Sequence, residues 1–303
     1  DNTSGGSSFD RSLRVIGTAY LQAPRTGTYI PDAARGAESE VEMKGKQSTL
    51  VNTLLSVGSV VVFLGIWWVF TEGLNLVSHR TLPGPIRVFN TFIYKLSNKN
   101  PDGNTLIFHT LISLRTALIG YLMAIAIGVP LGIVMAWYKA VDLFARPLFD
   151  LLKPIPGVAW VPLMIILLGI GVMSKATVIF ISAIVPCVLN AYSGIKQTKD
   201  VHLWVARTFG ASNLQMLFKI AIPTSLPFIV TGARVAIGAS WVTIVAAELL
   251  ASYAGLGFMI QQSRGLYRPD IIIVGMLTIG LCGAFLTFLL GLVEKRVVKG
   301  SRV

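Results

Sequence analysis

Long apolar runs, separated by short polar segments, follow one another along the chain from about residue 50 onward. Six of these runs approach the roughly 20 residues that an α-helix needs to cross the hydrocarbon core of a bilayer. A helix satisfies its own backbone hydrogen bonds and can therefore lie in lipid. The pattern predicts an all-α, polytopic membrane protein with about six transmembrane helices, at 51–71, 110–138, 156–172, 175–195, 225–250 and 270–294.

The composition agrees with this class of protein, since 53% of the 303 residues are hydrophobic, 13% are charged and the mean hydropathy is +0.69. The net charge of +12 lies in short clusters between the apolar runs, without the interleaved aromatic residues of a nucleic-acid surface. Nucleic acid is therefore not an expected partner. Cys187 and Cys282 lie inside apolar runs, and His79, His109 and His202 are far apart. The sequence predicts no disulfide, no metal site and no catalytic residues.

Residues 1–48 differ from the rest of the chain. They are rich in Gly, Ser and Thr, contain six Lys or Arg and six Asp or Glu, and show no sustained hydrophobic period. Such a segment cannot bury enough apolar surface to offset the entropy of ordering. We expect a polar, weakly ordered N-terminal tail, followed by a transmembrane domain over 49–303.

The distribution of Lys and Arg predicts the orientation of the chain in the membrane. With the N-terminus in the cytoplasm, the cytoplasmic segments hold 17 of these residues and the external segments hold seven. Without the N-terminal tail the cytoplasmic segments hold 11. Because cytoplasmic segments are the more basic in membrane proteins, both termini and the segment 200–222 are predicted to be cytoplasmic.

The segment 200–222, between the fourth and fifth apolar runs, contains signals for two short helices. Asp200 is expected to N-cap the first helix, and Gly210 to close it in the left-handed conformation. The apolar positions of that helix are Leu203, Ala206 and Phe209.

A capping box opens the predicted second helix of this segment, since Gln215 follows Ser212 by three residues. Pro223 is expected to end it before the fifth run. Its apolar face consists of Leu214, Leu217, Phe218 and Ala221. Three interpretations fit the segment: an amphipathic helix on anionic lipid, a well-capped connecting loop, or a surface that binds a partner.

The residues from Ala206 to Pro223 resemble the cytoplasmic loop of permease subunits of binding-protein-dependent ABC importers. Its usual form is E-A-A-x-x-x-G, followed by an apolar residue and Pro. Trp204 and Val205 stand where that family usually has Glu and Ala, so a role for that Glu does not carry over. In the family this loop docks on the ATPase subunit, which implies that the coupling residues here are Ala206, Arg207, Gly210, Ala211, Ser212, Phe218 and Pro223.

The resemblance extends over about residues 54–296, and it is nearest to the branch for nitrate, bicarbonate, taurine and alkanesulfonates. It rests on SLRTALIGYLMAIAIGVPLGIVMAW (113–137), PIPGVAWVPLMIILLGIG (154–171), TGARVAIGASWVTIVAAELL (231–250) and GLGFMIQQSR (255–264). It implies the type I ABC importer permease fold, a small oxyanion as solute, and a prokaryotic cell (inner) membrane.

The partners that this resemblance implies are two cytoplasmic ATPase subunits and an external solute-binding protein. The sequence contains no G-x-x-x-x-G-K-[ST] phosphate loop. ATP and Mg²⁺ are therefore expected on the ATPase subunits, with no cofactor in this chain and no enzymatic activity of its own. No internal repeat supplies two pore halves, so a homodimer is the simplest way to enclose a path.

Polar and charged residues inside the apolar runs are candidates for the translocation path, because such groups usually face a protein interior or a cavity. One reading is that Arg234 supplies positive potential for an oxyanion. We favour the other, in which Arg115 and Arg234 hold helices together or lie near an interface. Ser240, Trp241 and Thr243 are better candidates for the path, although Ser and Thr in membrane helices often bond only a neighbouring carbonyl. Glu248 is included as an ionisable residue within a span.

The segment GLGFMIQQSRGLYR (255–268) is predicted to form a short external helix that caps the path or meets the binding protein, or else an ordinary interfacial loop. Two rival functions would require other features of the sequence. A secondary transporter would be favoured by paired membrane carboxylates or inverted repeats. An integral-membrane enzyme would require clustered His, Asp or Ser at an interface.

Overall fold

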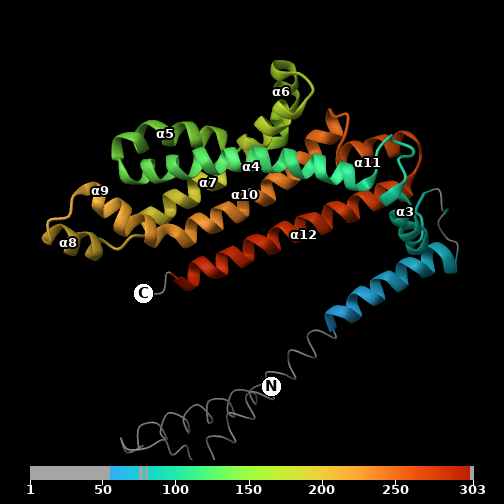
Figure 1. The fold of residues 1–303 in the computed structure, drawn as a ribbon, viewed down its shortest axis with the longest axis horizontal. Coiled ribbons are helices and arrows are strands. Elements are labelled where there is room, and N and C mark those ends of the chain that lie inside the picture. The colour runs from blue at the N-terminus through green and yellow to red at the C-terminus, as the bar shows by residue number, and fades with distance from the viewer. Residues whose placement is uncertain (1–54, 75–77, 79–80, 301–303) are drawn as a thin grey trace, which may run out of the picture. The chain divides into compact units, whose positions relative to one another are not determined.

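The computed structural model describes residues 55–74, 78 and 81–300, and every regular element among them is helical (Figure 1). The predicted polar tail over 1–48 lies outside these residues. The chain divides into two units, Asp1–Leu74 and Asn75–Val303. The first unit contributes one long apolar helix, Leu55–Gly73, which ends in the π-turn η1 (Val69–Gly73).

The second unit contains the remaining helices. Four helical stretches in it are long and apolar enough to cross a membrane: Leu106–Trp137, Val172–Lys196, Asn213–Leu250 and Pro269–Arg296. The bent pair Lys139–Leu152 and Gly157–Leu168 can form one further span. With Leu55–Gly73 this gives five or six spans, which confirms the predicted all-α polytopic fold. The elements are α3 (Pro85–Ser97), α4 (Leu106–Trp137), α5 (Lys139–Leu152), η2 (Gly157–Trp160), α6 (Val161–Leu168), α7 (Val172–Lys196), α8 (Asp200–Thr208), α9 (Asn213–Met216), η3 (Leu217–Ala221), α10 (Ile222–Leu250), α11 (Leu256–Gly265) and α12 (Pro269–Gly300).

The third predicted span differs from a simple helix. The structure divides it into η2 and α6, and places α5 before it, with an angle of 86° across the break. Pro154 and Pro156 lie at this break. Proline has no N–H group and its ring clashes with the preceding helical turn, so the helix cannot continue through them. Helix α5 is not among the predicted spans, because its mixed polarity is not typical of a transmembrane helix.

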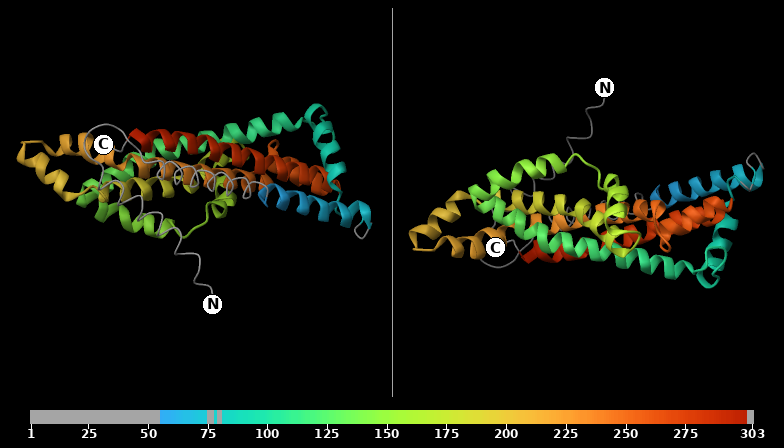
Figure 2. Two further views of the ribbon diagram at one scale, coloured as in Figure 1. Left: turned by 90° about the horizontal axis from the view of Figure 1, so that it is seen from below. Right: turned by 90° about the horizontal axis from the view of Figure 1, so that it is seen from above.

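Helix α7 packs between α4 and α10 at the centre of the second unit (Figure 2). Their common core is made of small or medium side chains, including Ala124, Ala183, Cys187 and Ala236, which are all buried. Glycines bring the backbones of α4 and α7 into contact. A Cβ atom on Gly132 would lie 2.5 Å from the carbonyl oxygen of Val188. Small residues of this kind let helices in lipid gain van der Waals contact.

The coupling segment and the short helices α3 and α11 lie at opposite ends of the second unit (Figure 1). Helix α11 confirms the short helix that was predicted over 255–268. It lies beside α12, which also holds α3. Thr91 of α3 donates a hydrogen bond of 3.1 Å to Asp270 of α12, whose carboxylate also pairs with Arg268 at 2.9 Å.

Replacing Gly132 by Ala should destabilise the protein, because the new methyl group meets a backbone oxygen that cannot move without shifting α7. Overpacking of this kind costs roughly 1–3 kcal/mol. Gly238→Ala is the matched control, since a Cβ there meets nothing within 4 Å. Thermal unfolding of both variants in detergent checks this expectation. Equal melting temperatures for the two variants would contradict the close α4–α7 contact.

Candidate functional site

The coupling segment, residues 200–222, begins with helix α8. Asp200 was predicted to be the N-cap of this helix, but it is the first helical residue. Lys199 occupies the cap position, and no side chain caps the helix. As the first helical residue, Asp200 places its charge near the positive end of the helix dipole, where a carboxylate is favourable without a capping bond.

The turn between α8 and α9 follows the predicted chemistry. Gly210 adopts a left-handed φ of 79°, and its N–H bonds the carbonyl of Arg207 at 3.0 Å. The N–H of Ala211 bonds the carbonyl of Ala206 at 3.0 Å, which completes a Schellman closure of α8. Ser212 then opens α9 through the capping box with Gln215. The turn is therefore well ordered by its own hydrogen bonds.

The second helix of the segment does not end at Pro223, which corrects the prediction. The short helix α9 passes through the π-turn η3 directly into α10, with the N–H of Ile222 bonded to the carbonyl of Leu217. A wide turn tolerates a proline just after it, because proline has no N–H to satisfy and the usual clash with the preceding turn is relieved. Residues Asn213–Leu250 consequently form one continuous helical stretch.

The predicted apolar face of the second helix divides in two. Leu217 and Ala221 are buried against Ala136 of α4 and Ile195 of α7. Phe218 points away from that core and is 64% exposed. Leu214 is exposed as well, together with Trp204 (65%) and Phe209 (87%) from the end of α8. Of the predicted coupling residues, Ala206 and Ala211 are partly buried, while Arg207, Gly210, Ser212, Phe218 and Pro223 are exposed.

Three of the predicted path residues on α10 make bonds that join helices or close a helical turn. Arg234 pairs with Glu294 of α12 at 2.8 Å. Ser240 donates a hydrogen bond of 2.8 Å to the carbonyl of Ala236, within α10. Trp241 donates one of 2.9 Å to the carbonyl of Ile279 in α12. Arg115, the other arginine inside an apolar run, is exposed on α4.

Thr243 belongs to a polar line between α7 and α10, which we call the α7–α10 seam. Its hydroxyl donates a hydrogen bond of 2.9 Å to Ser182 of α7. Two helical turns earlier on α7, Lys175 donates a hydrogen bond of 2.9 Å to Ser252, in the turn after α10. The seam thus consists of Lys175, Ser182, Thr243 and Ser252. Sequence reasoning found only Thr243, although a Lys and a Ser seven residues apart in an apolar run are a visible signal.

Glu248, the last predicted path residue, is buried and held by neutral donors. Ser113 of α4 lies 2.8 Å from both carboxylate oxygens, and the N–H of Gly257 donates to one of them at 3.0 Å. Ser113 also accepts a hydrogen bond of 2.8 Å from the N–H of Leu256. Gly255 has a φ of 123°, and a Cβ there would overlap the Glu248 carboxylate. Glu248 therefore ties α4 to the turn between α10 and α11.

A second buried cluster lies beside this turn. The N–H of Gly255 donates to Nδ1 of His109 at 3.0 Å, so Nε2 is the ring nitrogen that carries hydrogen. Nε2 lies 2.7 Å from Asp102 Oδ2, in a short contact that is not linear. The ammonium of Lys95 pairs with the other Asp102 oxygen and donates to the carbonyl of Asn104 at 2.6 Å. Both side chains of this ion pair are completely buried.

Burial raises the pKa of Asp102, but the short contact with His109 and the hydrogen bond and charge of Lys95 outweigh burial and lower this pKa below its ordinary value of 3.8. A carboxyl group with a lowered folded-state pKa stabilises the fold fully above its unfolded pKa, and this contribution is lost as the pH falls through the folded value.

Asp102→Asn should therefore lower stability at pH 7, because it leaves the buried Lys95 without its counterion. Breaking a buried pair in this way costs roughly 3–5 kcal/mol. The difference between the variant and the unsubstituted protein should shrink as the pH falls below about 4, where Asp102 is protonated first in the unfolded chain and then, at lower pH, in the folded protein. Thermal unfolding in detergent between pH 7 and pH 3 measures it. A difference that stays constant over this range would contradict the assignment.

The long apolar helices define an integral-membrane protein. Residues 128–300 match the family described as binding-protein-dependent transport system inner membrane component. The chain belongs to this family.

Three relatives cover most of the chain. A protein of Methanocaldococcus jannaschii, named as a candidate ABC transporter permease, is 40% identical over 79% of this chain and 90% of its own length. The taurine transport system permease protein TauC of Escherichia coli is 33% identical over 80% of this chain and 88% of its own. The nitrate import permease protein NrtB of Leptolyngbya laminosa is 30% identical over 93% of this chain and 98% of its own.

The fold is similar to a solved structure as well. An inward-facing structure of the MetNI methionine ABC transporter superimposes with a TM-score of 0.56, over 65% of this chain and 96% of the matched chain. The sequence identity is 16%, so this similarity concerns the fold alone. It confirms the type I importer permease fold that was predicted.

Proposed function

We propose that this chain forms the translocation path of an ATP-driven importer for a small oxyanion, such as taurine, an alkanesulfonate or nitrate. The relatives named for taurine and nitrate transport, which match this chain over most of its length, support this solute class. The chain would act as a homodimer with an external solute-binding protein and two cytoplasmic ATPase subunits, which bind ATP and Mg²⁺. Both termini and the coupling segment would face the cytoplasm of a prokaryotic cell.

The observation that carries this proposal is the exposed apolar surface of the coupling segment. Phe209 is 87% exposed at the tip of the turn, with Trp204 at 65% and Phe218 at 64%. The hydrogen-bonded turn at Gly210 fixes the backbone that carries these side chains, so they stay exposed. Exposed apolar groups on an ordered surface mark sites of protein association, and aromatic residues supply much of the binding energy at such sites. An ATPase subunit is the partner that fits.

The connection to the spanning helices favours a mechanical role for this surface. The coupling segment passes without a break into α10, and Leu217 and Ala221 pack against α4 and α7. A displacement of the segment by its partner would move α10 directly. In this proposal, ATP binding closes the ATPase pair, the pair displaces both coupling segments, and the spanning helices change between inward-open and outward-open arrangements.

The purified chain alone should hydrolyse no ATP, because it has no phosphate loop of its own. Co-expression with the ATPase and binding-protein genes next to it should yield a complex with ATPase activity. Proteoliposomes that contain this complex should take up the solute only with ATP. Uptake by the chain alone, driven by a proton or sodium gradient, would contradict the proposal. Calorimetry of the neighbouring binding protein with taurine, alkanesulfonates, nitrate and bicarbonate identifies the solute.

Gly210→Val should uncouple hydrolysis from transport. The position has a φ of 79°, which a β-branched residue adopts only with strain, and nothing lies within 4 Å of the added Cβ. The effect therefore arises from the backbone of the turn and not from a clash. Gly210→Asn is the matched control, since Asn tolerates this conformation. Uptake should fall about tenfold or more in the Val variant, while ATPase activity and melting temperature are retained. An unchanged uptake rate would count against the coupling role.

A further inference from the structure

Lys175 is a buried cation for which the rest of the described chain provides no close counterion. It lies in the first turn of α7 and is 7% exposed. Its side chain donates one hydrogen bond, to the hydroxyl of Ser252. An ammonium group has three donors, and no carboxylate lies within ion-pair distance of this one among the described residues. Removing a charge from water without a partner is costly.

Glu248 is the acidic group whose charge acts on Lys175, but its oxygens are already engaged. The two charges attract one another, but their atoms are farther apart than the 4.0 Å of an ion pair. The Glu248 carboxylate accepts hydrogen bonds from Ser113 and Gly257. Its charge reduces the cost of burying Lys175 and leaves donors of the ammonium without an acceptor.

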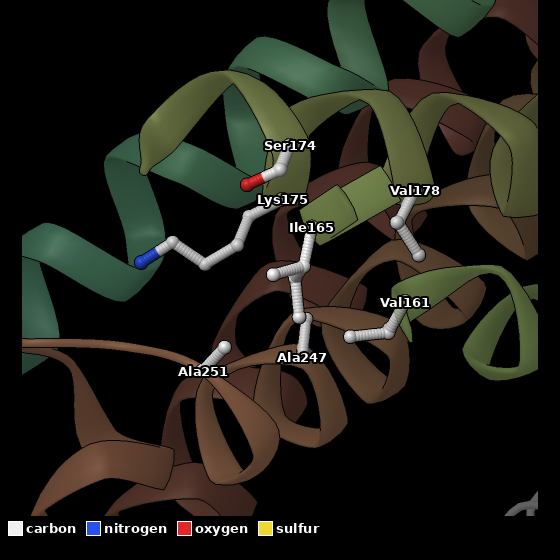
Figure 3. A pocket seen from close by; sticks show the side chains of 7 residues that line it. All are labelled: Val161, Ile165, Ser174, Lys175, Val178, Ala247 and Ala251. Carbon is white, nitrogen blue, oxygen red and sulfur yellow. The ribbon is translucent and has the colours of Figure 1, made fainter. Parts of the chain in front are cut away.

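Lys175 lines a crevice between α6, α7 and α10 (Figure 3). The crevice is partly open to its surroundings and is too narrow for a water molecule. Apolar groups of Val161, Val178 and Ala247 form its walls, and Figure 3 shows the side chain of Lys175 at its edge, with the nitrogen directed away from these three side chains. In such low-dielectric surroundings an electrostatic contact is much stronger than in water.

Lys175 belongs both to the lining of the crevice and to the α7–α10 seam. Lys175 and Ser182 are seven residues apart on α7 and therefore share one face of the helix. Ala247 lies one turn beyond Thr243 on α10. The seam thus carries an ammonium group at the end near α11 and a pair of hydroxyl groups, Ser182 and Thr243, two turns deeper. Charged and neutral donors in sequence are what a sulfonate or nitrate needs to exchange its hydration shell.

We propose that Lys175 binds the oxyanion of the transported solute, and that the solute's oxygens replace the Ser252 hydroxyl at the ammonium when α6 separates from α7 and α10. Lys175 is then a specificity-determining residue of the path, which selects anions at the end opposite the coupling segment. The inference rests on the proposed function and adds to it a site and a charge requirement.

The first experiment compares Lys175→Met with Lys175→Arg in the complete transporter, in proteoliposomes supplied with ATP and loaded binding protein. The probes are radiolabelled taurine, ethanesulfonate and nitrate, and the one that the unsubstituted complex carries is followed. Uptake should fall about tenfold or more in the Met variant, since a hydrogen bond to a charged group is lost, and only a few-fold in the Arg variant. Lys139→Met, which removes an exposed charge from α5, should leave uptake unchanged.

The second experiment restores the charge chemically and does not depend on how well the Met variant folds. Lys175→Cys is made with Cys187 and Cys282 replaced by Ala, and is treated with aminoethyl methanethiosulfonate, which adds an ammonium group, or with the neutral methyl reagent. Only the ammonium reagent should restore uptake, and the carried anion should slow the modification.

These outcomes separate the inference from the function on which it rests. Absence of ATP-dependent uptake by the unsubstituted complex overturns the proposed function. If that uptake is present, a Met variant with the unsubstituted rate overturns the role of Lys175 alone. Equal rescue by the neutral reagent, or modification that the anion does not slow, also overturns it, because either result indicates a packing role.

Discussion

The close approach of α7 to α4 and α10 is the constraint on which the second unit depends. In lipid, helices gain little from hydrophobic association, so they are held by van der Waals contact and by hydrogen bonds between them. Gly132 allows α4 to touch the backbone of α7, and Gly232 does the same for α10, where a Cβ would lie 2.5 Å from the side chain of Asn190. This approach brings Ser182 within 2.9 Å of Thr243. The seam exists because the backbones are near enough for short side chains to meet.

The sequence predicts the elements of this fold well wherever the signal is local. Apolar runs of sufficient length locate the spans, and the chemistry of Gly210 and Ser212 predicts both the end of α8 and the start of α9. The predictions for Asp200 and Pro223 were wrong, because each residue has a second favourable local arrangement. A carboxylate can interact with the helix dipole without capping it, and a π-turn can carry a helix through a proline.

The buried polar contacts could not be predicted in the same way, because their partners are distant along the chain. Ser113 and Glu248 are 135 residues apart, His109 and Gly255 are 146 apart, and Lys175 and Ser252 are 77 apart. Which face of each helix meets the other is decided by tertiary packing. A single sequence therefore identifies Glu248 as an unusual group and gives no indication of whether it lines a path or anchors a turn.

Two contacts at the α11 end of α10 differ in kind, and their relative strength determines how the helix can move. Glu248 is fixed by charge-assisted hydrogen bonds, and Gly255 and Gly257 let the turn lie directly against it. Lys175 reaches the same turn through one hydroxyl group. The single hydroxyl contact is the easier of the two to exchange, because an incoming anion offers the ammonium a stronger acceptor. A displacement that begins at the coupling segment should therefore pivot α10 about Glu248 and open the crevice at Lys175 first.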